Sequence, residues 1–194
     1  MSTTGTATST LTQAEREMAH EHLRQAQALL TGAIKGLTAA QWNFAPDKNW
    51  SIGQIVEHVI FVYELVDKRI LEALPSAPPT PERDHAAIDA LTINRFPNRL
   101  AKFNAPEVSV PSGCYATPAE ALARLGKIAA QFAKQIDSQQ DLRGHAIDSP
   151  PLKAITQGEH TVMDGYQWIL AASAHAERHV KQILEVRADP KFPV

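Results

Sequence analysis

Apolar side chains recur every three or four positions along four long stretches of the chain, which is the spacing of amphipathic helices. The first stretch begins at Thr12. Glu15 follows at the distance of a capping box, in which hydroxyl and carboxylate each bond the other residue's backbone amide. The second stretch begins at Ser51, with Gln54 in the same relation, and extends to about residue 74, where several prolines forbid further helix. The pattern therefore predicts two helices that begin at residues 12 and 51.

The third stretch carries the clearest start signal in the sequence. Thr117 is a capping residue, Pro118 fits the first helical position and Glu120 completes a capping box. The fourth stretch runs from about residue 161 or 163 to residue 186, and Pro190 lies just beyond its end. We expect the third helix to bury Leu122, Leu125, Ala129, Phe132 and Ile136.

The connections between these helices are longer than usual. Residues 75–116 form an insert between the second and third helices, with a short extra helix expected over 86–100 and an extended segment at 108–110. A second irregular stretch, 143–158, joins the third helix to the fourth. The expected fold is all-α: a four-helix bundle with long crossover connections. Residues 1–10 are rich in Ser and Thr and are expected to be a disordered tail, which leaves one domain over 11–194.

Composition excludes several classes of protein. The 194 residues are 44% hydrophobic and 21% charged, as is ordinary for a single globular domain. A net charge of −2 and the lack of a basic stripe argue against a nucleic-acid partner. No apolar run approaches the roughly 18 residues that cross a bilayer, and the N-terminal residues do not resemble a signal peptide. With Cys114 as the single cysteine, no internal disulfide can form. Together these features predict a cytoplasmic protein.

Three histidines carry the chemistry that can be argued from residue types. His175 and His179 are one helical turn apart, and both fall on the apolar face of the fourth helix, together with Trp168 and Ala172. His58 falls inside the apolar arc of the second helix. Buried imidazoles must be neutral or paired, because an unpaired buried charge is costly. The spacing therefore predicts that the three rings face inward and can converge on one metal ion.

A three-histidine set suits a divalent transition metal. Imidazole nitrogen binds zinc, nickel, copper or iron, and three protein ligands leave one position open for water or substrate, as in catalytic sites. The alternative is a hydrogen-bonded core role for each histidine, since a His-x-x-x-His spacing also arises by chance.

Four further residues are candidates for the pocket around the metal. Gln182 follows His179 by three residues, and Gln54 precedes His58 by four, so either amide could orient a ligand. For Gln54 we favour the capping role, whereas for Gln182 both interpretations stay open. Trp168 is either a core anchor or part of the pocket wall. Ala172 is small enough to leave room beside His175 for a ligand.

Three segments of the sequence together form a specific pattern. They are Leu37 to Gln41, Trp50-Ser-Ile-Gly-Gln-Ile55 followed by His58, and His175-Ala-Glu-Arg-His179-Val-Lys-Gln-Ile183. With these segments, the sequence resembles the DinB-like (DinB/YfiT) family of metal-dependent four-helix-bundle proteins, over about residues 12–187. The resemblance implies up-down-down-up connections and a divalent metal, with zinc or nickel expected, held by His58, His175 and His179. The 75–116 insert departs from the shortest family pattern.

Function is expected to follow from the metal. The resemblance implies an enzyme that acts on a small molecule, either a thiol-dependent transferase that uses a low-molecular-weight thiol or a hydrolase, and it implies a homodimer. The alternative is a non-catalytic, stress-related binding or assembly bundle whose histidines are structural. Elemental analysis of the purified protein separates the two.

Overall fold

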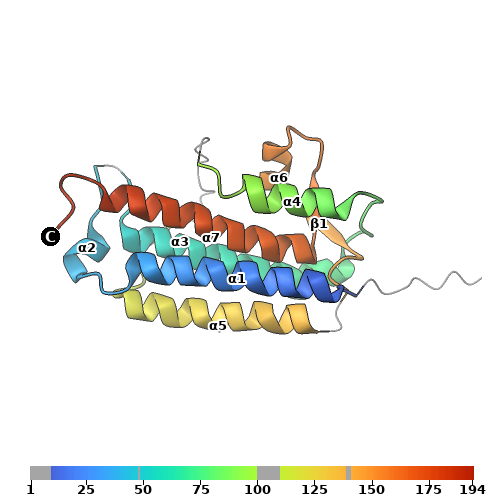
Figure 1. Cartoon of the computed structure of the whole chain (residues 1–194), viewed down its shortest axis with the longest axis horizontal. Helices are drawn as coiled ribbons and strands as arrows, with labels where there is room; N and C mark the ends of the chain where they lie inside the picture. The colour runs from blue at the N-terminus through green and yellow to red at the C-terminus, as the bar shows by residue number, and fades with distance from the viewer. Residues whose placement is uncertain (1–9, 48, 100–109, 139–140) are drawn as a thin grey trace, which may run out of the picture.

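The computed structural model describes residues 10–47, 49–99, 110–138 and 141–194 of the chain. Within these residues four long helices lie side by side as a bundle (Figure 1). The all-α class and the four-helix bundle expected from the sequence are therefore confirmed. The four helices are α1 (Gln13–Ile34), α3 (Ile52–Lys68), α5 (Pro118–Asp137) and α7 (Gly165–Arg187).

The connectivity of the bundle is unusual. α1 packs against α7 and α5, and α3 packs against the same two helices, so α1 and α3 lie on a diagonal. Figure 1 shows α1 and α7 running in one direction and α3 and α5 in the other. The order is therefore up-down-down-up, with two pairs of parallel neighbours. Because α3 and α7 are antiparallel neighbours, side chains in the first half of α3 can face side chains in the second half of α7.

The helix starts are those that the sequence predicts for α1, α3 and α5. Complete capping boxes form at Thr12 with Glu15 and at Ser51 with Gln54. Thr117 caps α5 and Pro118 occupies its first position, but the box is incomplete, because the carboxylate of Glu120 accepts from the amide of residue 116 rather than from that of the cap.

Two helix boundaries differ from the prediction. α7 begins later than residue 161 or 163, because residues 162–164 form a strand and Asp164 is the cap. After α3 the chain continues as a π-helical turn, η1 (Arg69–Ala73), and a 3-10 turn, η2 (Leu74–Ser76), so the predicted helical stretch to residue 74 is not regular α-helix throughout.

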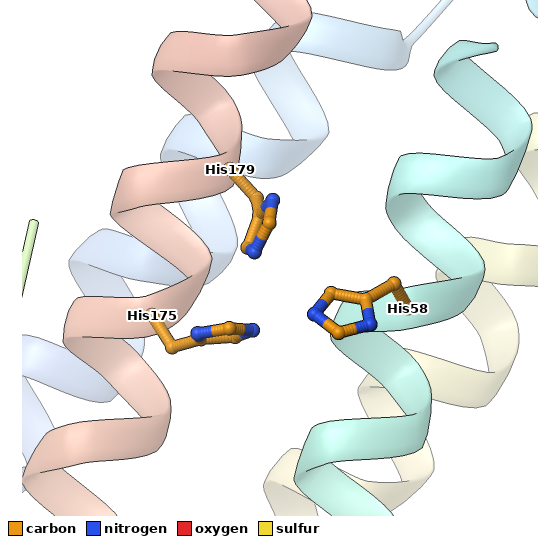
Figure 2. Close-up of side chains that lie close together, drawn as sticks. All are labelled: His58, His175 and His179. Carbon is orange, nitrogen blue, oxygen red and sulfur yellow. The ribbon is translucent and has the colours of Figure 1, made fainter. Parts of the chain in front are cut away.

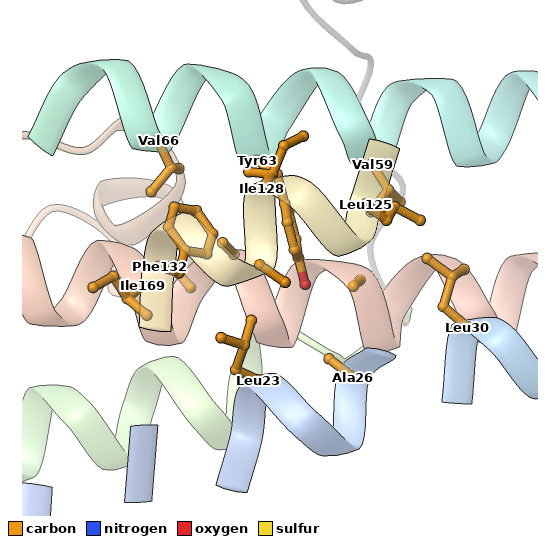
Figure 3. Packing of buried hydrophobic residues seen from close by; sticks show 14 of the residues in the cluster. Leu23, Ala26, Leu30, Val59, Tyr63, Val66, Leu125, Ile128, Phe132 and Ile169 are labelled. Atoms are coloured by element: carbon orange, nitrogen blue, oxygen red, sulfur yellow. The ribbon is translucent and has the colours of Figure 1, made fainter. Parts of the chain in front are cut away.

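The core is a continuous apolar layer between the four helices. Figure 3 shows side chains from α1, α3, α5 and α7 meeting in the bundle interior, and the rings of Tyr63 and Phe132 are 5.4 Å apart. The predicted α5 face is buried apart from Leu122, which is half-buried. Burial of this apolar area supplies the main free energy that holds the helices together.

The crossover connections contain small elements of their own. The α1–α3 link holds α2 (Ala39–Asn43), and the insert holds α4 (His85–Arg95), which packs on α7 and ends earlier than the expected residue 100. The α5–α7 link contains α6 (Pro150–Ile155) and a hairpin of β1 (Ala146–Asp148) and β2 (Val162–Asp164), which was not expected from the sequence.

Some sequence expectations fall on residues that the structure does not describe. These include nearly all of the tail, at 1–9, and residues 108 and 109 of the expected extended segment. Across the part of the chain that is described, no helix combines the length and the apolar character that spanning a bilayer demands.

A buried ionic network fastens the insert to the bundle. Arg143 lies at its centre and bonds Asp89 of α4 through both terminal nitrogens (3.1 and 2.7 Å), Asp164 at the start of α7 (3.0 Å) and Glu15 of α1 (2.6 Å). The guanidinium also lies over the ring of Tyr166, 4.1 Å from its centroid. Every nitrogen of the Arg143 guanidinium is therefore bonded, and four separate segments are held at one end of the bundle.

Candidate metal centre

The structure brings the three predicted histidines together between α3 and α7. His58 projects from α3 and meets His175 and His179 from the facing surface of α7 (Figure 2). The ring centroids are 5.2 Å apart for His58 and His175, 4.9 Å for His58 and His179, and 4.4 Å for His175 and His179. One ring nitrogen of each points into the shared space (Figure 2).

The spacing of the three rings fits a single small cation. One nitrogen from each ring lies within 4.8 Å of the other two. Nitrogen atoms bound to one zinc ion in a tetrahedral arrangement lie about 3.4 Å apart. Small rotations of the side chains are therefore enough to bring all three nitrogens to bonding distance of one ion.

Burial keeps two of the three histidines neutral. His58 and His179 are only 5% and 7% exposed. Burial, reinforced by His58, lowers the pKa of His179 to about 3, although its hydrogen bond to Gln182 acts in the opposite direction. Burial and the two neighbouring rings place the pKa of His175 well below its ordinary value of 6.5. At neutral pH these two imidazoles are uncharged, which is the state that binds metal.

One nitrogen of the cluster lacks a partner. Within the described residues, Nε2 of His175 is buried and forms no hydrogen bond, although the rest of the residue is partly exposed. An unsatisfied buried nitrogen costs free energy, typically about 1–3 kcal/mol. A lone pair held in this position beside two other imidazoles is the arrangement that a bound cation would satisfy.

Gln182 bonds directly to the cluster. Its Oε1 atom lies 2.8 Å from Nδ1 of His179. Metal-binding histidines generally donate their second ring nitrogen to an oxygen acceptor, which fixes the ring and its tautomer. Of the two alternatives left open for Gln182, the structure provides the contact that the orienting role needs.

The other pocket candidates have different surroundings. The carbonyl oxygen of Gln54 accepts from the backbone of Ser51 at 2.9 Å, so its amide is used in the capping box. Trp168 is buried and lies under the guanidinium of Arg69, which is 4.8 Å from the ring centroid. Ala172 is buried on α7. For these three residues a role at the metal stays a prediction.

Trp50 is a neighbour of the cluster that the residue pattern did not predict. Its ring centroid lies 5.0 Å from that of His58. Trp50 immediately precedes the cap of α3, and the predicted helix start contained no signal for the direction of its side chain. The ring therefore packs beside the ring of His58.

Two other groups are unsuited to act as nucleophiles. The hydroxyl of Tyr166 donates to the backbone oxygen of Glu15, at 2.9 Å, in the end network. Cys114 is exposed, and slight desolvation together with the carboxylate of Glu57 raises the pKa of its thiol, which disfavours the thiolate. Glu57 itself accepts hydrogen bonds from the backbone amides of residues 112, 113 and 114, and so fixes this loop to α3 beside His58.

Comparison with known proteins assigns the chain to a family. The sequence model that describes the DinB superfamily matches residues 22–183. The chain belongs to the DinB superfamily. The matched region contains α3 and nearly all of α7, and with them all three histidines. No curated protein matches the chain at a significant level.

A solved DinB-like structure has the same fold. The chain is similar to YfiT from Bacillus subtilis, described as a probable metal-dependent hydrolase with an unusual four-helix bundle topology. The TM-score is 0.54 with 17% sequence identity, over 92% of this chain and 89% of YfiT. At this identity the likeness concerns the fold alone.

Proposed function

We propose that this DinB-superfamily protein is a metal-dependent enzyme that acts on a small molecule, with His58, His175 and His179 as the protein ligands of a divalent ion. The observation that carries the proposal is the buried, unpartnered Nε2 of His175 beside two further imidazoles. A purely structural role would leave this nitrogen unsatisfied, whereas a shared cation satisfies it.

The residues of the chain would hold and shield the ion. The three imidazoles come from two antiparallel helices whose positions are fixed by the bundle core, so the donor set is rigid. Gln182 holds the ring of His179, and Trp50 limits access of water to His58. When bound, a divalent ion with three protein ligands supplies Lewis acidity at an open position and makes a water or thiol there more acidic.

We propose zinc or nickel as the ion, because neutral imidazoles favour both. Hydrolysis of a small substrate is the reaction that we place first, since it needs only water and since YfiT is described as a probable metal-dependent hydrolase. Transfer of a low-molecular-weight thiol to an electrophile would use the same open position. The thiol would have to come from solution, because the raised pKa of Cys114 disfavours its thiolate.

The first test is elemental analysis of protein purified without a metal-affinity tag. We expect one zinc or nickel ion per chain in the wild type and none in His175→Ala, with helical content unchanged. His22→Ala is a matched control, because His22 is a partly buried histidine on α1 that is not part of the cluster. Folded wild-type protein without a metal, and unable to bind one, would favour the non-catalytic alternative.

The second test is activity. Esters, amides and thioesters of small acids are screened with the metal-loaded protein, with and without a low-molecular-weight thiol. We expect turnover to disappear with a chelator and with His175→Ala, and to return when the metal is restored. Turnover that needs the added thiol would identify a transferase, and turnover without it a hydrolase.

We further propose that the protein is a cytoplasmic homodimer. Leu29 of α1 and Leu184 of α7 are 49% and 50% exposed, and they border an apolar groove between these two parallel helices that also contains Gly32 and Val180. Two copies related by a twofold axis would cover each other's grooves. Light scattering of wild type and Leu184→Glu measures this directly: a monomeric wild type contradicts the dimer.

A further inference from the structure

The end of the insert lies along α7 beside the histidine cluster. After α4 ends at Arg95, the backbone oxygen of Pro97 accepts from Lys181 Nζ at 3.0 Å, and that of Asn98 accepts from Arg178. Arg99 then forms a two-pronged pair with Glu185, with both nitrogen–oxygen distances at 2.8 Å. Residues 97–99 are therefore held against the turn of α7 that carries His179.

Arg99 also reaches the residue that bonds His179. Its Nη1 atom lies 3.3 Å from Oε1 of Gln182, and the same oxygen lies 2.8 Å from Nδ1 of His179. An arginine has only donors, so the amide atom that faces it must be the carbonyl oxygen. That oxygen can only accept from the ring, so Nδ1 of His179 carries the proton.

The location of this proton decides where the lone pair of His179 points. With a proton on Nδ1, the lone pair is on Nε2, and Figure 2 shows one nitrogen of this ring directed into the space shared with His58 and His175. If the amide of Gln182 turned over, its NH₂ group would face Nδ1 and favour the other tautomer. The ring would then present an N–H to the cluster.

We propose that Arg99 is a positioning residue of the metal centre: it fixes the amide of Gln182, which in turn fixes the metal-binding tautomer of His179. The inference rests on the proposed function and assigns a role to the insert, which supplies Arg99. The positively charged guanidinium is held by Glu185, so its orientation toward Gln182 does not depend on the metal. Contacts of this kind typically change metal affinity about 10- to 100-fold.

The proposal is tested with Arg99→Met, Gln182→Leu and a control, Arg124→Met. Arg124 pairs with Glu64 across α5 and α3, so the control removes a comparable arginine–glutamate pair outside the cluster. Zinc affinity is measured by competition with a chromophoric chelator. We expect about a 10-fold loss for Arg99→Met, a loss toward 100-fold for Gln182→Leu and no change for Arg124→Met.

A second measurement needs no metal. Long-range nitrogen–proton NMR spectra of the metal-free protein at neutral pH distinguish the two tautomers of each histidine. We expect the Nδ1–H form for His179 in wild type and in Arg124→Met, and a mixture or the Nε2–H form in Arg99→Met. A purely structural role for Arg99 would not move this signal.

The outcomes separate the two proposals. If wild type binds zinc and Arg99→Met binds it equally well with an unchanged tautomer, the inference is wrong and the proposed function stands. If folded wild type binds neither zinc nor nickel, both are wrong. A shifted tautomer together with weaker zinc binding, both absent from Arg124→Met, supports the inference.

Discussion

Two buried polar clusters lie on α7, and they differ in how completely their atoms are paired. At the start of the helix, Asp164 belongs to the ionic network in which every nitrogen of the Arg143 guanidinium is bonded within the protein. Further along, His175 and His179 meet His58, and the buried Nε2 of His175 has no partner among the described residues. Arg143 and its three carboxylates therefore form a complete cluster, although Nε of the neighbouring Arg83, which also bonds Asp164, is buried without a partner among the described residues. The histidine cluster is incomplete.

The difference distinguishes structural from functional burial of polar groups. Buried polar atoms in native proteins nearly always have hydrogen-bond partners, so an exception calls for a specific explanation. The network around Arg143 has a structural role, because it joins α1, α4, α7 and the link after α5. The histidine cluster requires something from outside the chain, and a cation is the partner that neutral imidazoles share.

The largest effect is expected when the complete cluster is broken. Arg143→Met leaves the carboxylates of Asp89 and Asp164 buried without their central cation, which should lower the free energy of unfolding by about 3–5 kcal/mol. Urea unfolding measures this loss. The folded fraction should still bind zinc normally, because the histidines lie elsewhere on α7. A loss of less than about 1 kcal/mol would contradict the central role of Arg143.

The second prediction concerns the stabilisation that zinc provides when it binds the incomplete histidine cluster. Zinc at 100 times its Kd should raise the free energy of unfolding of the wild type by about 2.7 kcal/mol, and should leave His175→Leu unchanged. Without metal, the two proteins should have similar stability, because the substitution removes an unsatisfied nitrogen. Thermal unfolding with and without zinc measures both effects. A severely destabilised metal-free His175→Leu would show that the ring has a structural role.

The third prediction uses pH to test the charge of Glu15, whose carboxylate lies at the edge of the complete cluster. Burial alone would raise the pKa of Glu15, but hydrogen bonds from Thr12 and the guanidinium of Arg143 outweigh it, so its pKa is lower than the ordinary 4.5. Its stabilising contribution is therefore complete above pH 4.5 and is lost as the pH falls through the lowered pKa of the folded state.

Glu15→Gln should accordingly be less stable than wild type at neutral pH, by about 1 kcal/mol after screening by water. The difference should shrink as the pH falls below 4.5. Urea unfolding at a series of pH values measures it. A difference that stays constant across the series would show that the carboxylate charge does not contribute.

The smallest expected effect distinguishes a capping role of Gln54 from a role at the metal site. Its amide is used in the capping box of α3, so Gln54→Ala should lower the free energy of unfolding by about 0.5–1 kcal/mol and leave zinc affinity unchanged. Chelator competition and urea unfolding on the same sample give both quantities. A clear loss of zinc affinity would instead show that Gln54 acts at the metal site with His58.

Much of the fold could be predicted because its signals are local. The capping boxes at Thr12 and Ser51 and the apolar stripes each occupy one continuous segment, and they were sufficient to predict the bundle. The meeting of His58 with His175 followed from the apolar face on which each lies. The delayed start of α7 escaped prediction because three-residue strands are too short to show an alternating pattern.

The complete cluster could not be predicted, because its members come from distant segments. Nothing near Arg143 in the sequence indicates Asp89 or Glu15 as its partners, and their pairing depends on the path of both crossover connections. The same holds for Arg99, whose contact with Gln182 exists only because the insert returns across α7. Long-range polar pairs have no sequence period, whereas apolar faces do.

The separation of the histidines along the chain also has a consequence for biosynthesis. His58 lies on α3 and His175 on α7, so the second and third imidazoles leave the ribosome long after the first. No early fragment can present more than one of the three rings to an ion. Uptake of metal would therefore follow completion of the bundle. Binding of one ion by all three rings would require α3 and α7 to be in their native arrangement.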